Sequence, residues 1–133
     1  MQVKIQNQNI LITGATGGIG KTIVKSFDED NNNLLIIGTN EKKLNALSQE
    51  LKSSTKYLAC DFNDYRNIRD IITKINEEFD NKIDILINNA GITKDNLTLR
   101  MKEEQWNDVI NLNLTTTFFL TKEILKLMVK NRF

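Results

Sequence analysis

The sequence predicts an α/β fold, a doubly wound parallel sheet with helices on both faces. Four short apolar runs indicate strands, segments with helical spacing separate these runs, and a glycine-rich turn joins the first run to the first helical segment. Strands that alternate with helices in this way pair in parallel through right-handed crossovers. We expect the strand order 3-2-1-4, which is one half of a doubly wound three-layer sheet.

The predicted strands are nearly continuous in apolar residues, as strands buried on both faces must be. They cover residues 9–13 (NILIT), 34–38 (LLIIG), 56–60 (KYLAC) and 83–88 (IDILIN). In the expected order the last of these strands forms an edge of the sheet. An apolar edge invites pairing with another chain, so we expect the 133-residue chain to self-associate when it is expressed alone.

Apolar residues at helical spacing predict a helix after each of the first three strands. The three stripes comprise Ile19, Ile23 and Phe27, then Leu44, Leu47 and Leu51, then Ile68, Ile71, Ile72, Ile75 and Phe79. A further helix is expected from about Glu103 to near Lys130. Its stripe consists of Trp106, Val109, Ile110, Asn113, Thr117, Leu120 and Ile124. Asn113 is an amide in that apolar stripe, and without hydrogen-bond partners it would cost about 1–3 kcal/mol.

Length and composition exclude several classes of protein. The 133 residues suit one domain, and 18 basic against 17 acidic residues give no charge that favours nucleic acid or a membrane surface. The sequence contains no histidine, which excludes a Ser-His-Asp triad and a histidine zinc site within it. Its single cysteine, Cys60, allows no internal disulfide and is expected to be a buried residue at a strand end. We expect no bound metal.

The amino-terminal residues contain no apolar stretch long enough for a signal peptide, and no later run approaches the length of a membrane span. A single cysteine fits a reducing compartment. We therefore expect a cytoplasmic protein.

The glycine-rich turn lies where the first strand meets the first helix. Gly14 follows the strand and suits a tight turn, Gly18 allows a phosphate to approach the backbone, and Gly20 allows close helix–strand packing. Backbone N–H groups and the positive end of a helix dipole meet there. The turn is therefore a predicted anion site, typical of dinucleotide binding.

The same residues also support a phosphate-loop enzyme. The segment ATGGIGKT (15–22) departs from that motif only at Ala15, which replaces the first glycine. Lys21 would contact phosphates, Thr22 would bind magnesium, and Asp61 would be a second magnesium ligand. A P-loop nucleotide hydrolase or kinase therefore stays open as an alternative at this point.

Three features taken together resemble the short-chain dehydrogenase/reductase family. They are the pattern Thr13-Gly14-x-x-x-Gly18-x-Gly20, Asp61 after the third strand, and NNAG (88–91) after the fourth. Within that family, residues 88–114 are similar to bacterial 3-oxoacyl-[acyl-carrier-protein] reductases of fatty-acid biosynthesis, an oxidoreductase class of lipid metabolism. The resemblance extends over essentially the whole chain and implies a Rossmann-type fold and a nicotinamide cofactor.

The resemblance also implies roles for particular residues. Around the glycine turn, Gly14, Gly18 and Gly20 would hold the pyrophosphate, and Thr13 and Ile19 would also contact the cofactor. The adenosine half would contact Thr39, Asp61 and Phe62, whereas Asn88, Ala90 and Gly91 would line the groove toward the nicotinamide. Asn113 corresponds to the asparagine of the family's catalytic tetrad, which holds a water in a proton relay.

The end of the second strand favours NADPH over NADH. An NAD-specific site has a carboxylate there, whereas this sequence has Gly38, Thr39 and Asn40. Glu41 follows directly but is expected to lie inside the next helix. The preference is expected to be modest, because Gly17 stands where many family members have an arginine for the 2′-phosphate.

The other three tetrad residues, a serine and a tyrosine four residues before a lysine, are not found in this sequence. Tyr57 precedes Asp61 and Tyr65 precedes Arg69 at that spacing, so neither tyrosine has a lysine to lower its pKa. We expect residues 1–133 to be a partial Rossmann domain, the cofactor-binding half of a reductase, and to be inactive alone. The alternative is a non-catalytic nucleotide-binding or interaction fragment.

The resemblance finally implies partners. The substrate would be a 3-oxoacyl thioester on acyl carrier protein, an acidic partner that arginine near the end of the last helix would contact. Arg132 has that placement, with Lys126 and Lys130 nearby. Cations at a helix C-terminus also favour the helix dipole without any partner. The complete family member is expected to be a dimer or tetramer.

Overall fold

The computed structural model describes residues 4–28 and 31–132. Its four strands form one parallel sheet in the order β3-β2-β1-β4, as the sequence predicts. The strands are β1 (Asn9–Ile12), β2 (Asn33–Gly38), β3 (Ser54–Ala59) and β4 (Ile85–Ile87). Leu11 of the central strand lies opposite Leu35 of β2 and Leu86 of β4.

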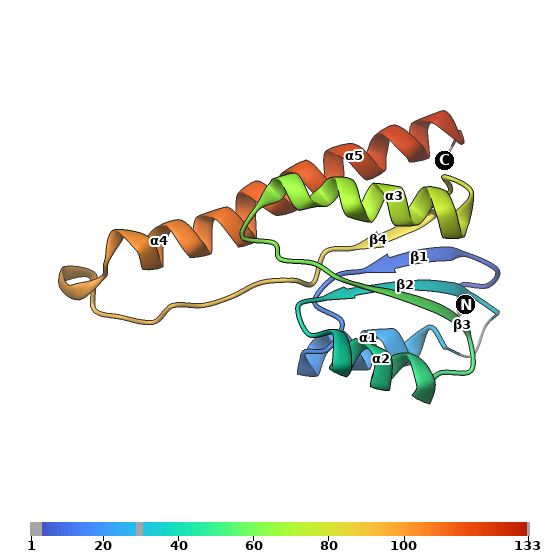
Figure 1. The fold of residues 1–133 in the computed structure, drawn as a ribbon, viewed down its shortest axis with the longest axis horizontal. Helices are drawn as coiled ribbons and strands as arrows, with labels where there is room; N and C mark the ends of the chain where they lie inside the picture. Colours follow the sequence, from blue (N-terminus) through green and yellow to red (C-terminus); the bar gives the residue numbers. More distant parts are fainter. Residues whose placement is uncertain (1–3, 29–30, 133) are drawn as a thin grey trace.

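Helices cover both faces of this sheet (Figure 1). Helices α1 (Gly18–Ser26) and α2 (Glu41–Glu50) lie on one face, and α3 (Ile68–Phe79) and α5 (Thr117–Lys130) lie on the other. A shorter helix, α4 (Glu103–Ile110), extends away from the sheet beside the long connection that follows β4. Short 3₁₀ turns at Tyr65–Asn67 and Thr98–Arg100 complete the regular structure.

The long helix expected over residues 103–130 is present but is not a single α-helix. Residues Asn111–Thr116 form a π-helical turn between α4 and α5. Leu112 and Thr116 are buried, whereas Trp106 is 59% exposed and Asn113 is also exposed.

The predicted stripe shares one face, since Trp106, Val109 and Asn113 line the same pocket. No residue of α4 is buried, because this helix extends away from the sheet. Leu120 and Ile124 lie beyond the turn and are buried as predicted.

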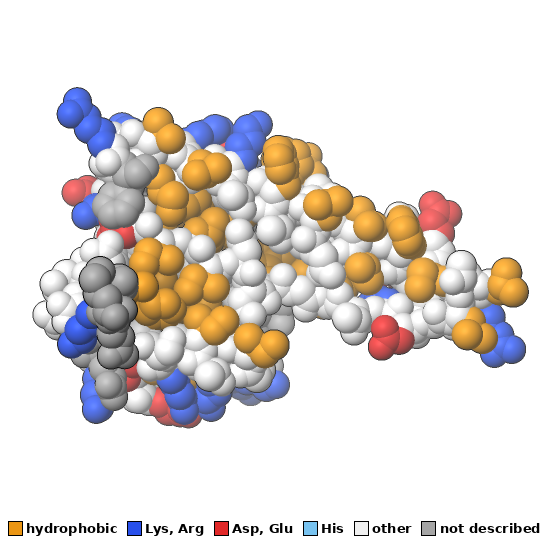
Figure 2. All heavy atoms as spheres, turned by 180° about the vertical axis from the view of Figure 1, so that it is seen from behind, with side chains coloured by type: hydrophobic (Ala, Val, Ile, Leu, Met, Phe, Trp, Pro, Cys, Tyr) orange, Lys and Arg blue, Asp and Glu red, His pale blue; other side chains and the backbone are white. Residues whose placement is uncertain are grey.

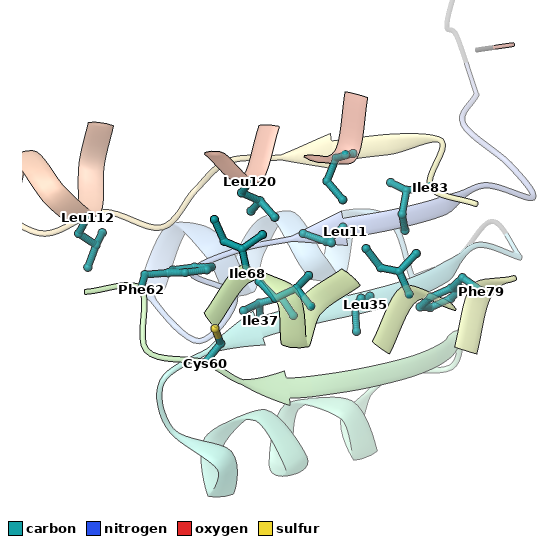
Figure 3. Close-up of a cluster of buried hydrophobic side chains, with 13 residues drawn as sticks. Leu11, Leu35, Ile37, Cys60, Phe62, Ile68, Phe79, Ile83, Leu112 and Leu120 are labelled. Carbon is teal, nitrogen blue, oxygen red and sulfur yellow. The ribbon is translucent and has the colours of Figure 1, made fainter. Parts of the chain in front are cut away.

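Two apolar clusters hold the layers together. The cluster between the sheet and α1/α2 consists of Ile10, Ile12, Ala15, Val24, Leu34, Ile36, Leu44 and Leu47. The cluster on the α3/α5 face is shown in Figure 3 and includes Leu11, Leu35, Ile37, Phe62, Ile71, Ile75, Leu112 and Leu120. Alternate residues of β1 and β2 enter opposite clusters, which explains why these strands are apolar throughout.

The two edge strands differ in chemistry. On β3, Lys56 pairs with Glu78 of α3 at 3.5 Å, and charged side chains protect an edge from pairing with other chains. On β4, the half-buried residues Ile85, Leu86 and Ile87 are all apolar. Figure 2 shows hydrophobic side chains gathered on the face that contains this edge. Among the described strands, β4 pairs only with β1, so it is the predicted apolar edge.

Side-chain contacts also fix β1 against β4 at the amino ends of the strands. The backbone N–H of Asn9 donates to Asp84 Oδ2 at 2.8 Å, and the Asn9 side chain donates to Lys82 O at 2.9 Å. The Lys82 ammonium lies 3.5 Å from Asp84 Oδ1.

Within the described part of the chain, no helix is both long and apolar enough to cross a membrane.

Candidate functional site

A cavity of about 380 Å³ lies at the carboxyl ends of the strands. Its lining comes from the turn after β1, the ends of β2 and β3, and the segments that follow β4: Gly14, Thr16, Gly17, Gly18, Ile19, Gly20, Gly38, Thr39, Phe62, Asn89, Ala90, Gly91, Ile92 and Leu112. The chain leaves β1 toward one face of the sheet and leaves β4 toward the helices of the other. Ligands of open parallel sheets bind at such a point.

The three glycines of the turn have different structural roles. Gly14 has φ of +62°, and a Cβ there would lie 2.9 Å from the backbone of Ala90. A Cβ on Gly20 would lie 1.9 Å from Gly14 O, so only glycine allows this helix–turn approach. A Cβ on Gly18 would have no heavy atom within 4 Å. Gly18 therefore presents open backbone to the cavity.

The amino terminus of α1 faces this open space. Gly17 is the N-cap residue and has no side chain to bond the first-turn N–H groups, and that first turn contains no acidic residue. These N–H groups and the helix dipole favour an anion. The uncapped helix terminus therefore lies next to the cavity, at the place where the sequence predicts an anion site.

Lys21 and Thr22 do not line the cavity. The Lys21 ammonium lies 3.6 Å from Glu50 Oε1 of α2, and Lys25 pairs with the same carboxylate at 3.2 Å. The Thr22 hydroxyl donates to Gly18 O at 3.1 Å. The two side chains that a phosphate loop would require are thus engaged on the outer surface of α1.

Thr13 is buried and connects β1 to the loop after β4. Its Oγ1 accepts hydrogen bonds from the N–H groups of Asn89 at 3.1 Å and Ala90 at 3.0 Å, and donates to Ile87 O at 3.4 Å. Thr13 does not line the cavity itself. It fixes the position of Asn89 and Ala90, which do.

Asn89 is a site residue that the sequence reasoning did not assign. Its side-chain amide donates to Gly14 O at 3.0 Å and contacts the position where a Gly20 Cβ would lie. Its place as the second asparagine of NNAG is the only sequence signal for this role. The preceding residue, Asn88, is exposed and donates instead to Thr121 Oγ1 of α5 at 3.0 Å. Ala90 and Gly91 line the cavity.

The adenosine-side candidates divide in a similar way. Phe62 is 5% exposed and lines the cavity, as do Thr39 and the 74%-exposed Ile19. Asp61 is exposed and lies outside the lining, where its Oδ1 accepts from the N–H of Asn63 at 2.9 Å. Glu41 is the first residue of α2 and also lies outside the lining.

Asn113 has the partners that its position requires. Its Oδ1 accepts from the N–H of Ile92 at 2.9 Å, and its Nδ2 donates to Ile92 O, also at 2.9 Å. The amide thus pairs with both backbone groups of one residue next to the cavity. A Cβ on Gly91 would lie 3.4 Å from Asn113 Oδ1, so the contact is close.

Cys60 is 6% exposed at the end of β3, as expected of a structural cysteine. Burial raises the pKa of its thiol to about 11, with smaller contributions from the negative charges of Asp70 and Asp61. Such a thiol is protonated and unreactive near neutral pH.

The described residues also contain no cluster of three or more acidic, cysteine or histidine residues that could hold a metal ion.

The model of the family described as short chain dehydrogenase matches residues 8–133. The chain belongs to the short chain dehydrogenase family. It is similar to a short chain dehydrogenase from Bacillus anthracis of known crystal structure, with a TM-score of 0.86 and 28% sequence identity over 95% of this chain and 51% of that one. Membership of this family overturns the P-loop alternative, in agreement with the positions of Lys21 and Thr22.

Curated relatives of this short chain dehydrogenase are reductases. The 3-oxoacyl-[acyl-carrier-protein] reductase FabG of Rickettsia bellii is 38% identical over 131 residues, which is 98% of this chain and 52% of that protein. The FabG protein of Escherichia coli K12 is 40% identical over 122 residues, or 92% of this chain and 50% of the relative. The chain thus spans about half the length of the curated relatives it matches.

Proposed function

We propose that this chain is the cofactor-binding part of an NADPH-dependent 3-oxoacyl-[acyl-carrier-protein] reductase. The observation that carries the proposal is the cavity at the carboxyl edge of the sheet, where an uncapped helix terminus, the open backbone of Gly18 and the NNAG loop meet. The two FabG relatives at 38% and 40% identity support the choice of reductase.

The residues present fit a dinucleotide. The pyrophosphate would lie against the N–H groups at the start of α1, where Gly18 leaves room and no acidic side chain opposes it. Phe62 and Thr39 would contact the adenosine half, and Ala90 and Gly91 would line the path toward the nicotinamide. When bound, the nicotinamide would supply the hydride, and the chain's own residues bind and orient it.

The preference for NADPH is proposed on electrostatic grounds. Thr39 lines the cavity at the end of β2, Asn40 uses its side chain to cap α2, and Glu41 points its charge outside the lining. A 2′-phosphate at Thr39 would therefore meet no carboxylate among the lining residues. Fluorescence titration with NADPH and NADH tests the proposal. Tighter NADPH binding is expected, and equal affinities or tighter NADH binding would contradict it.

Mg-ATP is the control ligand in the same titration. It should not compete with NADPH, because Lys21 pairs with Glu50 and is not placed to bind phosphates. Competition by Mg-ATP at concentrations similar to those of NADPH would argue for a general nucleotide-binding module instead.

We further propose that residues 1–133 alone do not reduce a 3-oxoacyl thioester. Asn113 is the one tetrad position that the sequence supplies, and it can help to place a water but cannot protonate the product oxygen. General acid catalysis contributes about 10²–10⁴-fold in rate. The test is NADPH oxidation with acetoacetyl thioester, and turnover by this chain alone would contradict the proposal.

Docking of the acidic acyl carrier protein at Arg132 is a separate proposal. Arg132 is exposed beyond the end of α5, and the nearby Lys126 is paired with Glu123 at 2.6 Å, which leaves Arg132 as the more available cation of the two. Arg132→Glu should weaken carrier-protein binding measured by calorimetry, whereas Lys126→Glu should weaken it less. The homo-oligomeric state of the complete reductase remains a proposal, to be measured by light scattering.

A further inference from the structure

The loop that carries Phe62 into the cavity is held by side chains of the π-helical turn. Thr116 Oγ1 donates to Phe62 O at 2.6 Å, and Asn111 Nδ2 donates to Asn63 O. Thr116 is 2% exposed and Phe62 is 5% exposed, so water does not replace the bond between them. The loop backbone is thus anchored at two consecutive carbonyl groups.

The π-helical winding places the two anchors of this loop, Asn111 and Thr116, on the same side of the helix. Residues Asn111 and Thr116 are five positions apart, and a π-helix closes its hydrogen bonds between residues five apart. In a regular α-helix, residues five apart would differ by about 140° around the axis, so both could not reach one loop. A bond from Thr117 Oγ1 to Leu112 O at 3.4 Å also joins residues five apart in this turn.

The same turn also holds a second segment of the cavity lining. Asn113 bonds both backbone groups of Ile92, and Leu112 lines the cavity directly. One six-residue turn therefore fixes both the loop at Phe62 and the segment at Ile92. Stacking of Tyr65 on Phe119 of α5, with ring centroids 4.8 Å apart, strengthens the attachment of the first loop.

We propose that Thr116 is a positioning residue for the adenosine half of the cofactor and that it acts through the backbone of Phe62. Asn111 is the second anchor of the same loop. This inference rests on the proposed function, because Phe62 contacts adenosine only if the cavity holds a dinucleotide. Neither Asn111 nor Thr116 belongs to the glycine turn, the NNAG loop or the tetrad position Asn113.

The experiment compares Thr116→Val with Thr116→Ser in the 133-residue chain. Valine keeps the shape but removes the donor to Phe62 O, whereas serine restores it. Titrations use NADPH and adenosine 2′,5′-bisphosphate, which represents the adenosine half alone. The Val variant should raise the Kd of both ligands about three- to tenfold, and the Ser variant should stay within about twofold of wild type.

Two readouts separate positioning from a general loss of stability. Hydrogen exchange should become faster at amides 62–67 in the Val variant but stay unchanged at residues 89–92, which Thr13 and Asn113 hold. Thr115→Val is the matched control, because the half-buried Thr115 hydroxyl forms no hydrogen bond within the described residues. If Thr116→Val does not fold, Asn111→Ala tests the same loop from its second anchor.

The outcomes distinguish this inference from the function on which it rests. Wild-type chain that binds no NADPH would overturn both. Wild-type binding with unchanged affinity in Thr116→Val, or a lower melting temperature without weaker binding, would overturn the inference alone. Weaker NADPH binding with unchanged affinity for adenosine 2′,5′-bisphosphate would also overturn it, because the loss would then lie outside the adenosine half.

Discussion

The glycine wall of the cavity (residues 14–20) and the opposite wall, formed by Phe62, Ile92 and Leu112, are held by different kinds of contact. In the glycine wall, backbone packs on backbone, and the close approach of Gly20 to Gly14 O leaves no space for a side chain. In the opposite wall, side chains of the π-helical turn bond the backbone of two separate loops. The first wall depends on the absence of side chains at its glycines, and the second depends on specific hydrogen-bond donors and acceptors.

This difference determines how each wall should respond to substitution. Adding one methyl group at Gly14 or Gly20 of the glycine wall creates a clash with backbone, which can be relieved only by moving that backbone. Removing one hydroxyl or amide from the opposite wall releases a loop and leaves the helices in place. Substitutions in the first wall should therefore affect folding, and those in the second should affect local order.

Gly20→Ala should have the largest effect. Its Cβ would lie 1.9 Å from Gly14 O and 2.7 Å from the Asn89 side-chain amide. We expect the free energy of unfolding to fall by about 3 kcal/mol or more, the upper range for overpacking. Urea denaturation followed by circular dichroism measures it.

Gly18→Ala is the matched control for this prediction, because a Cβ there meets no atom within 4 Å. Its free energy of unfolding should stay within about 1 kcal/mol of wild type. NADPH affinity should nevertheless decrease, because the methyl group would occupy the space proposed for the pyrophosphate. Similar urea midpoints for the two variants would refute the distinction between the glycines.

Thr13→Val should have the next largest effect, because Thr13 joins the two sides of the site. Valine fills the same space but leaves the N–H groups of the half-buried residues Asn89 and Ala90 without their acceptor. The expected loss is about 2–4 kcal/mol in the free energy of unfolding. Thr13→Ser keeps the oxygen and should recover most of this loss, and a Ser variant as unstable as the Val variant would contradict the assignment.

Asn113→Ala should lower the free energy of unfolding less, because Asn113 is exposed and water can replace its hydrogen bonds to Ile92. We expect a loss of about 1 kcal/mol, together with faster hydrogen exchange at the Ile92 amide and no change at residues 62–67. Asn113→Asp is the control, since its carboxylate can accept from Ile92 N but cannot donate to Ile92 O. Faster exchange in both loops would show that the turn moves as one body.

The ionisation of Cys60, which lies in the apolar cluster with Phe62, should have the smallest effect on the free energy of unfolding near neutral pH. Its thiol pKa is raised to about 11, against about 8.5 in an unfolded chain, so both states are protonated at pH 7. Above about pH 8.5 the unfolded chain releases this proton first, and stability should decrease as the pH rises to about 11.

Alkylation by iodoacetamide measures the thiol directly. The rate should increase with a midpoint near pH 11 in the native chain and near pH 8.5 in urea. A Cys60→Ala variant should lose this part of the pH dependence of stability. A native alkylation midpoint at the unfolded value would show that Cys60 is not buried in solution.

Local sequence information was sufficient for the glycine wall. The turn from Gly14 to Gly20 is contiguous, lies between a strand and a helix, and needs only backbone geometry to form. β1 and β2 were equally predictable, because burial on both faces leaves a continuous apolar run, whereas the residues of β3 are exposed or half-buried. The order β3-β2-β1-β4 followed from the doubly wound fold that the glycine turn and the family resemblance imply.

The opposite wall depends on partners distant in the sequence. Asn113 bonds a residue 21 positions away, and Thr116 bonds one 54 positions away. A periodic pattern predicts which residues share a face but cannot show that α4 extends away from the sheet, so the exposure of Trp106 could not be predicted. The sequence showed that Asn113 needed partners, but only the folded chain shows that Ile92 supplies them.

The central position of β1 has a consequence for synthesis on the ribosome. β1 precedes β4 in the chain, and the contact between Asn9 and Asp84 joins residues 75 positions apart. At about 5–20 residues per second, β1 waits about 4–15 s for its second neighbour. During that time Ile10, Leu11 and Ile12, which are fully buried in the finished fold, lie at an open edge of the nascent sheet. A holdase chaperone that binds short apolar strands would find its target in this interval.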